Sequence, residues 1–364
     1  MEHFKSNPFT EILTDKELDS VVDSYSSLYN PLYFLFGKED REFTSEYRKE
    51  IITITNESIA KIKAHDKQFL LSLKNRLLDS KSYDGPESSL GEIRTYGILY
   101  DLFGDNVKPR QPSPNKPTSD FEVSLKDKKI IVEVNSPQPD VTLNNEGKLK
   151  WEKELFKEAL DLPNGKTFSI RVTSKAPFGR ENCQNLYENV IHKLTQIKQG
   201  DKQSEQDYYS ILWVDLFDAN ISIISETGIF KKPLLVKEIE GDTIVSTNVL
   251  WYSIYGKKGL PIYDSKTAYD GTTAIMLHDG KFVYSSSSKW DMVIFASPLN
   301  TVVYQNPYSS KQPSIKLIKK IRNLARFNRK MSRISVSKEH LKNIIRKDYK
   351  FIQKINDKNK TQHF

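Results

Sequence analysis

The sequence predicts an α/β protein with a mixed central sheet flanked by helices and with helical additions at both ends. Three observations support this fold class: an amphipathic segment over 88–104, alternating segments between 107 and 135, and further apolar segments after them. Helical and strand periods following one another in one stretch are typical of helices packed on a sheet. At 364 residues with 37% hydrophobic content, the chain is long enough to bury a substantial core.

The first core helix is expected over 88–104. Its apolar residues fall on one stripe, formed by Leu90, Ile93, Gly97 and Tyr100. Gly104 comes just past its end, where a helix commonly stops. A short strand is expected near Val107 to Arg110.

A β-hairpin is predicted from Thr118 to Asn135, and it gathers polar groups on one face. The two-residue period of a strand places Asp120 and Glu122 on one face of the first strand. In the second strand the same period puts Glu133 and Asn135 on one face. Three carboxylates and an amide on one face are the layout of a divalent-metal site.

The expected turn sets how these residues pair. A four-residue turn over 126–129 would place Asp120 across from Asn135 and Glu122 across from Glu133. Opposed side chains have Cβ atoms roughly 5 Å apart, so facing carboxylates repel unless a cation lies between them. A hard cation such as Mg²⁺ or Mn²⁺ prefers carboxylate oxygens and would remove that cost.

The alternative is that these acids simply face water, as acids on half-exposed hairpins often do. The run from Ile130 to Asn135 favours the metal site, because it is apolar and β-branched like a strand buried on both faces. A charge such as Glu133 is costly in that setting without a partner or a metal.

The segments after the hairpin continue the pattern. A second core helix is expected over Leu149 to Leu160, a strand over Lys166 to Ser174 and a third helix over 179–200. A further buried strand is expected over Ile211 to Phe217; its Asp215 is either a site residue or an acid satisfied by hydrogen bonds. The predicted elements therefore follow the order helix, three strands, helix, strand.

On these residues the chain resembles the PD-(D/E)xK nuclease superfamily over about residues 88–217. Asp120 matches the Asp of that motif, Glu133 matches its acidic residue, and Glu92 matches an acid often found on the first core helix. Ser119 stands where the motif name has Pro. Asn135 stands in the place of the motif Lys.

The resemblance implies a restriction-endonuclease-like core and a Mg²⁺- or Mn²⁺-dependent endonuclease that hydrolyses DNA, in a setting such as restriction or anti-phage defence. Asp120 and Glu133 would hold one or two metal ions, and Glu92 would contact a metal directly or through water. Asn135 would position the attacking water. Glu122 is either a further ligand or a solvated bystander.

The Asn at the Lys position leaves two further alternatives open. An amide carries no charge, so the cation would come from elsewhere, and Lys153, Arg171 and Lys193 are candidates. Otherwise the protein is a catalytically inactive nuclease fold that binds nucleic acid or acts as a scaffold subunit.

Positive charge is concentrated at the C-terminal end. The formal net charge is +8, but residues 311–364 contain 17 Lys and Arg against 3 Asp and Glu, or 17 − 3 = +14, which leaves 8 − 14 = −6 for residues 1–310. The tail reads as two helices, which are either packed on the body as a solvated pair or clamp the phosphates of DNA, with RNA not excluded. The expected clamp residues are Lys316, Lys319, Lys320, Arg322, Arg326, Arg329, Lys330 and Arg333.

These observations divide the chain into a helical N-terminal region over 1–87, a nuclease-like core with a β-rich extension over 88–310, and a basic helical region over 311–364. Thr14 is expected to cap an N-terminal helix, and the apolar repeat over 57–78 is a packing or dimerisation element. Residues 225–305 alternate like strands, with a turn at 278–281, and either extend the sheet or form an insertion.

Composition excludes several classes. One cysteine, Cys183, excludes an intrachain disulfide, and six scattered histidines do not give the spacing of a zinc site. No apolar run approaches the length of a membrane span, so a cytoplasmic protein is expected. A homodimer or a partner subunit from a defence system remains open.

Overall fold

The structure is a computed structural model of the 364-residue chain. It describes residues 7, 9–22, 31–36, 45–79, 84–111, 118–126, 128–137, 194–195, 197, 208–217, 234–239, 242–246, 249–256, 258, 261–262, 274–275, 278–284, 288–296, 301–306, 308–311 and 317. The helix expected over 149–160, the strand over 166–174, nearly all of the helix over 179–200 and nearly all of the basic tail lie outside these residues.

The helices are α1 (Asp15–Val22), α2 (Pro31–Phe36), α3 (Ser45–His65), α4 (Lys67–Leu77), α5 (Asp84–Phe103) and α8 (Val249–Tyr255), with a 3₁₀ turn η2 (Gly104–Asn106). The strands are β1 (Val107–Pro109), β2 (Phe121–Ser124), β3 (Lys129–Asn135), β4 (Tyr208–Asp215), β5 (Leu234–Ile239), β6 (Asp242–Ser246), β7 (Pro261–Ile262), β8 (Ala274–Ile275), β9 (Met292–Ala296) and β10 (Thr301–Gln305).

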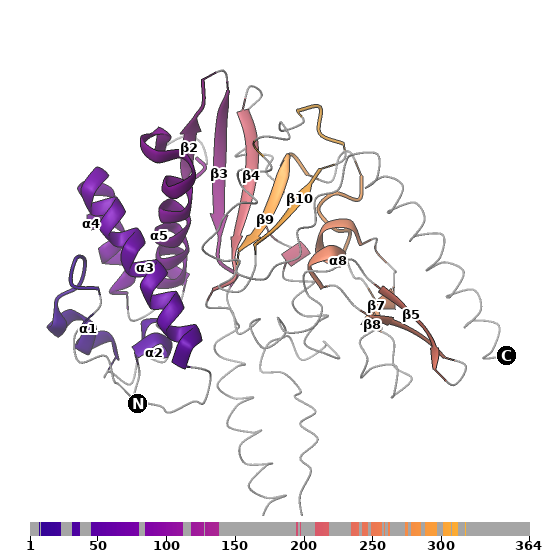
Figure 1. The fold of residues 1–364 in the computed structure, drawn as a ribbon, viewed down its shortest axis with the longest axis horizontal. Coiled ribbons are helices and arrows are strands. Elements are labelled where there is room, and N and C mark those ends of the chain that lie inside the picture. The colour runs from indigo at the N-terminus through magenta and orange to yellow at the C-terminus, as the bar shows by residue number, and fades with distance from the viewer. Residues whose placement is uncertain are drawn as a thin grey trace, which may run out of the picture.

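A six-stranded sheet in the order β1-β2-β3-β4-β9-β10 forms the centre of the molecule (Figure 1). The outer pairs β1/β2, β2/β3 and β9/β10 are antiparallel, whereas β3/β4 and β4/β9 are parallel. The prediction of a mixed central sheet flanked by helices is therefore confirmed. Strands β1, β2 and β3 and the preceding helix α5 follow in the expected order.

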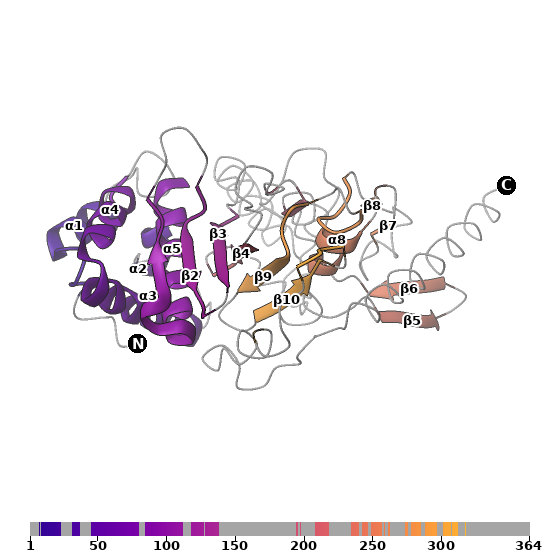
Figure 2. The same cartoon turned by 90° about the horizontal axis from the view of Figure 1, so that it is seen from above.

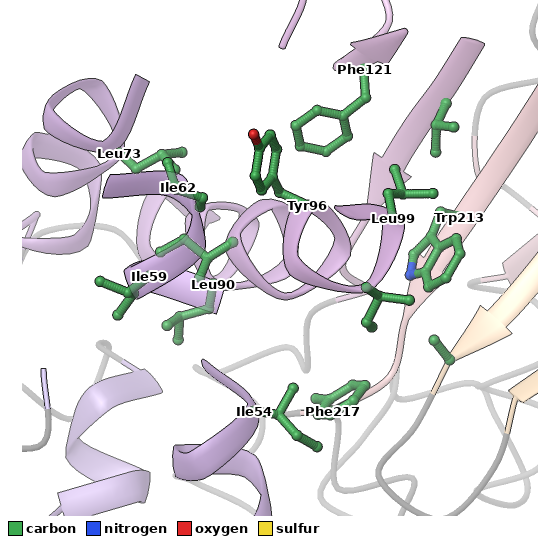
Figure 3. Close-up of a cluster of buried hydrophobic side chains, with 14 of the residues drawn as sticks. Ile54, Ile59, Ile62, Leu73, Leu90, Tyr96, Leu99, Phe121, Trp213 and Phe217 are labelled. Carbon is green, nitrogen blue, oxygen red and sulfur yellow. The ribbon is translucent and has the colours of Figure 1, made fainter. Parts of the chain in front are cut away.

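The helices α3, α4 and α5 lie on one side of the sheet (Figures 1 and 2). Their apolar side chains share one cluster with the facing side of the sheet, and Figure 3 shows Leu99 and Trp213 meeting there. Tyr96 and Phe121 are in edge-to-face contact, with ring centroids 5.9 Å apart. The helical N-terminal region and the sheet thus have a common core.

The apolar repeat over 57–78 is divided between two helices at Asp66. The Oδ1 of Asp66 accepts a hydrogen bond from the Phe69 N–H at 2.9 Å and so caps α4. Five apolar residues of this repeat are buried, namely Ile59, Ile62, Leu70, Leu73 and Leu77, whereas Phe69 is half-buried. Packing within the shared core explains why these residues are apolar. A role in dimerisation stays a prediction.

The β2–β3 hairpin has a tighter turn than expected. Leu125 and Lys128 exchange backbone hydrogen bonds at 2.8 and 3.4 Å, so the loop is two residues long instead of four. Glu122 therefore pairs with Ile131 and not with Glu133, and that part of the prediction is wrong. Two-residue loops match the right-handed twist of paired strands, which favours this register. A shift of two residues leaves every side chain on its predicted face.

The C-terminal half of the sheet comes from the segment predicted to alternate like strands. Strands β9 and β10 extend the central sheet, which was one of the two predicted alternatives for this segment. Strands β5/β6 and β7/β8 form separate two-stranded sheets. The helix α8 was not expected; the hydroxyl of its Tyr255 donates to the Gln305 carbonyl of β10 at 2.8 Å. Among the described residues, no helix combines the length and the apolar character needed to cross a membrane.

Two glycines, Gly97 within α5 and Gly104 directly after it, are required by the local geometry of the chain. Gly104, directly after the helix, has φ of +60°, which a residue with a side chain adopts at a cost. At Gly97, a Cβ would lie 2.0 Å from the Ser58 Oγ and 2.9 Å from the Ser58 Cα, so α3 and α5 approach at backbone distance.

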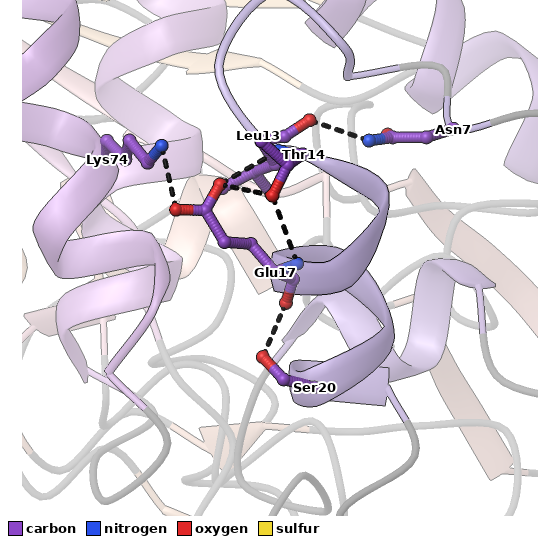
Figure 4. A network of polar contacts seen from close by, with 6 residues as sticks. All are labelled: Asn7, Leu13, Thr14, Glu17, Ser20 and Lys74. Atoms are coloured by element: carbon purple, nitrogen blue, oxygen red, sulfur yellow. Dashed lines mark hydrogen bonds and ion pairs between the residues drawn. The ribbon is translucent and has the colours of Figure 1, made fainter.

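The start of α1 is fixed by the expected cap at Thr14 (Figure 4). The Glu17 N–H donates to Thr14 Oγ1 at 3.3 Å, and Glu17 Oε2 accepts from the Thr14 N–H at 2.8 Å, which together form a capping box. Lys74 of α4 lies 2.8 Å from Glu17 Oε1 and ties the two helices together.

Gly97→Ala should destabilise the protein by about 1–3 kcal/mol, the usual cost of forcing extra atoms into a packed core. The reason is that the nearest atoms at this position include the backbone of α3. Urea unfolding followed by circular dichroism measures the effect. Gly85→Ala is the control, because its new Cβ would meet no atom closer than 3.5 Å. Equal effects of the two substitutions would contradict this packing.

The stability of the protein should fall as the pH drops from about 4.5 to about 2 in part through Glu17. Hydrogen bonds from Lys74 and from the Thr14 backbone lower the pKa of Glu17 from 4.5 to about 2. A carboxyl with a lowered folded-state pKa stabilises the fold above its unfolded pKa and loses this contribution as it protonates. Glu17→Gln and Lys74→Gln should both flatten the acid limb of melting temperature against pH, whereas an unchanged limb in both would contradict the assignment.

Candidate functional site

Asp120 and Glu133 face each other at one end of the β2–β3 hairpin. Extending the register of the two strands by one residue places Asp120 directly opposite Glu133 instead of Asn135. The Oδ2 of Asp120 accepts a hydrogen bond from the Val134 N–H at 2.7 Å, which holds the carboxylate at the end of β3. Glu133 is 5% exposed. The actual register thus brings the two motif carboxylates closer together than the predicted one.

Asn135 is the last residue of β3 and lies on the same strand face as Glu133. It pairs with Val214 of the parallel strand β4. Its side chain is half-buried, in contrast to that of Glu133. The amide therefore follows the carboxylate pair toward the carboxyl end of β3.

The sequence analysis missed one cationic residue, Arg110, which directly follows β1 and pairs with Asp120 through its backbone. The Arg110 N–H donates to the Asp120 carbonyl at 2.9 Å, so Arg110, Asp120 and Glu133 form one row across three strands. Its Nη1 donates to the Ser119 Oγ at 3.0 Å. The position of Arg110 just after a strand could have suggested this role, but only once the register of β1 on β2 was known.

Glu92 is engaged by a second cation, Arg76 of α4. The two nitrogens Nη1 and Nη2 of Arg76 donate to Oε1 and Oε2 of Glu92, each at 2.7 Å. Burial lowers the pKa of Arg76, but the hydrogen bonds and charge of Glu92 and the charge of Asp120 outweigh it and raise the pKa. Arg76 is therefore within electrostatic reach of Glu92 and of Asp120.

This geometry bears on the expected role of Glu92. Because both of its oxygens accept hydrogen bonds from Arg76, a direct metal contact requires Arg76 to move. Contact through water stays a prediction. No pattern in the sequence marks Arg76, which lies 16 residues before Glu92 on a different helix.

Asp215, at the end of β4, is satisfied by hydrogen bonds. This confirms one of the two predictions made for this residue. Arg94 of α5 donates through Nε and Nη2 to its two oxygens at 3.1 and 3.0 Å, and both side chains are fully buried. The Phe217 N–H donates to Asp215 Oδ1 at 3.1 Å, and the Arg94 guanidinium lies 5.0 Å from the Phe217 ring centroid. The pair attaches α5 to the sheet beside the site.

The same helix fits tightly against the end of β3. A Cβ on Gly91 would lie 2.0 Å from the Ser136 Oγ and 3.4 Å from the Asp215 Cβ. Glu92 follows Gly91 directly, so this close approach positions its carboxylate near the ends of β3 and β4.

The donor chemistry of the site fits a hard divalent cation in part. Asp120 and Glu133 supply carboxylate oxygens, and Mg²⁺ is often held by one or two carboxylates with water and phosphate oxygens completing its shell. Within the described part of the chain, no group of three or more His, Cys, Asp or Glu side chains is gathered closely enough to hold a metal. Lys153, Arg171, Lys193 and the eight clamp residues of the tail lie outside the described residues.

Removing either partner of the buried Arg94–Asp215 ion pair should lower the free energy of unfolding. Arg94→Met or Asp215→Asn alone should destabilise the protein by about 3–5 kcal/mol, because each leaves an unbalanced buried group. The double variant should lose less than the sum of the two single losses, which chemical denaturation of all four proteins measures as a coupling energy. Additive losses would show that the two side chains do not depend on each other.

Comparison with protein-family models, with curated proteins and with solved structures found no match. The functional assignment therefore depends on the chemistry of this chain's own residues. Its centre is the Asp120–Glu133 pair, with Arg110 and the Arg76–Glu92 pair beside it.

Proposed function

We propose that this protein is a Mg²⁺- or Mn²⁺-dependent endonuclease that hydrolyses DNA phosphodiester bonds on a restriction-endonuclease-like fold. The observation that carries the proposal is the opposition of Asp120 and Glu133 on neighbouring strands, next to Arg110 and Arg76. The order α5, β1, β2, β3 and then β4 parallel to β3 agrees with such a core.

Asp120 and Glu133 would hold the divalent cation. When bound, that ion lowers the pKa of a water molecule and offsets the negative charge of the phosphate. The Val134 N–H keeps the Asp120 carboxylate in place through its 2.7 Å hydrogen bond, so this ligand is oriented before any ion arrives. The Asn135 amide, on the face of Glu133, would hydrogen-bond the attacking water.

The charge that the motif Lys would supply has a source in this chain. Arg110 lies in the same cross-strand row as Asp120 and Glu133, where a guanidinium could bind a non-bridging phosphate oxygen. Arg76 is tied to Glu92 and therefore serves first to balance that carboxylate. Arg110 is accordingly the preferred candidate for contact with the scissile phosphate.

The runner-up is a catalytically inactive nuclease fold that binds nucleic acid or serves as a scaffold subunit. One observation favours it: three carboxylates, Glu92, Asp120 and Glu133, are accompanied by two cations, Arg76 and Arg110. Most of the negative charge is thus balanced by the protein itself. A site that already holds two cations has less need of a bound metal than three facing carboxylates without cations would have.

Cleavage of supercoiled plasmid in Mg²⁺ or Mn²⁺ tests the proposal. Asp120→Asn and Glu133→Gln should each lower the rate by at least roughly 10²-fold, the lower scale of contributions from positioned catalytic groups. Glu122→Gln is the matched control, since Glu122 pairs with Lys129 and lies opposite Ile131. A parallel assay with RNA of the same sequence establishes which nucleic acid is cut.

Two outcomes would reject the proposal. One is an intact protein that binds DNA yet leaves it uncut in both metals, which supports the inactive fold. The other is cleavage that survives both Asp120→Asn and Glu133→Gln, which would move the activity to another part of the chain. Calorimetric titration of Mn²⁺ into the three variants separates loss of metal binding from loss of turnover.

A further inference from the structure

Lysines gather at the turn of the β2–β3 hairpin, at the end of the sheet away from the Asp120–Glu133 pair. Lys126, Lys128 and Lys129 are all exposed there. The amino end of β4 lies alongside, because Lys129 pairs with Tyr208 and Ile130 with Tyr209.

Two tyrosines contact Lys128 and Lys129. The Lys128 Nζ donates to the Tyr209 hydroxyl at 2.9 Å and lies 4.9 Å from the centroid of that ring. The Lys129 Nζ lies 5.6 Å from the Tyr208 ring centroid, and the Lys311 Nζ donates to the Tyr208 carbonyl at 2.9 Å. Side chains restrained in this way lose less conformational freedom when they bind a ligand.

Arg110 connects this region to the candidate site. Its guanidinium lies 6.0 Å from the Tyr208 ring centroid, while its backbone pairs with Asp120. Positive groups therefore continue along the sheet from the row that contains Asp120 and Glu133 to the hairpin turn.

The local charge stays positive after the acids are included. Four lysines, Lys126, Lys128, Lys129 and Lys311, stand with three acids, and 4 − 3 = +1, while Arg110 lies in the row of Asp120 and Glu133. Of these acids, Glu122 is paired with Lys129 at 3.0 Å, Asp127 belongs to the turn in the sequence, and Asp291 is buried within electrostatic reach of Lys311.

We propose that this surface, the hairpin-end patch (Arg110, Lys126, Lys128, Lys129, Lys311, Tyr208 and Tyr209), binds the sugar–phosphate backbone of nucleic acid without reading its sequence. Exposed lysines gathered at the end of a sheet are suited to phosphates, and such contacts position a duplex without discriminating between bases.

The choice of nucleic acid over another polyanion rests on the proposed function, because the patch leads toward the carboxylate pair proposed to cut phosphodiesters. The inference goes beyond that function by naming a binding surface at the hairpin end of the sheet, to which the basic region over 311–364 contributes only its first residue, Lys311. Binding is measured in EDTA, where metal-dependent cleavage cannot occur, so the two proposals succeed or fail separately.

The experiment measures binding of a fluorescent 30-base-pair duplex to the full chain from about 50 to 300 mM salt. The variant Lys126→Gln/Lys128→Gln/Lys129→Gln should bind more weakly, and its slope of log K against log salt should be shallower by about 2–3, since each phosphate neutralised contributes roughly 0.9. The control Lys16→Gln/Lys63→Gln/Lys67→Gln removes the same charge from exposed lysines of the helical layer. It also removes one exposed ion pair, Lys63–Glu11, to match Lys129–Glu122.

Each outcome has one meaning. A shallower slope in the patch variant alone, with the melting temperature unchanged, supports the proposal. An unchanged slope, equal losses in both triple variants, or no binding of duplex by the intact protein overturns it. Loss of binding to vesicles containing phosphatidylserine, with duplex binding intact, would overturn nucleic acid as the ligand. Patch-dependent binding without cleavage in Mg²⁺ leaves the patch standing and rejects the nuclease.

Discussion

The buried ion pair between Arg94 and Asp215 is the constraint on which the arrangement of the site depends. It joins the middle of α5 to the carboxyl end of β4, and the Gly91 backbone approaches Ser136 in the same region. A charged pair without solvent access tolerates little displacement, because either partner alone would be a costly buried charge. The helix is therefore held in one position along the sheet. Glu92 lies between these two contacts in the sequence, so its distance from β3 follows from the docking of the whole helix.

Charge balance is the second feature that organises this end of the sheet. Asp120 and Glu133 face one another across the hairpin, while Arg76 and Arg110 approach from α4 and from β1. The cations come from elements that precede the hairpin in the chain. Under the proposed function, the site therefore has positive charge nearby even though Asn135 itself carries none. The same balance explains why the folded chain tolerates facing carboxylates.

The hairpin has two ends of different chemical character. One end presents carboxylates and an amide, and the other presents lysines restrained by tyrosines. The two-residue turn determines both. It makes Lys129 the first residue of β3, where its ammonium reaches Glu122 and Tyr208, and it aligns Asp120 with Glu133. A four-residue turn would have put Lys129 in the loop and Asn135 across from Asp120. A local choice of loop length thus sets the pairing at both ends of the strands.

Local patterns in the sequence predicted the elements that carry the site and the faces of the hairpin: the two-residue period put Asp120, Glu133 and Asn135 on one side, the apolar stripe identified α5, and Gly104 marked its end. Periodicity carries this information because it is local. The pairing register of the hairpin does not follow from this local pattern, because a slip of two residues keeps every side chain on the same face. Only the hydrogen bonds of the formed turn select one pairing. The sequence likewise did not predict the ion pairs of Arg76 and Arg94, because their partners lie 16 and 121 residues away. Only the packing of α4 and α5 against the sheet decided which cations meet which carboxylates, as distant charges are brought together by burial of the apolar core.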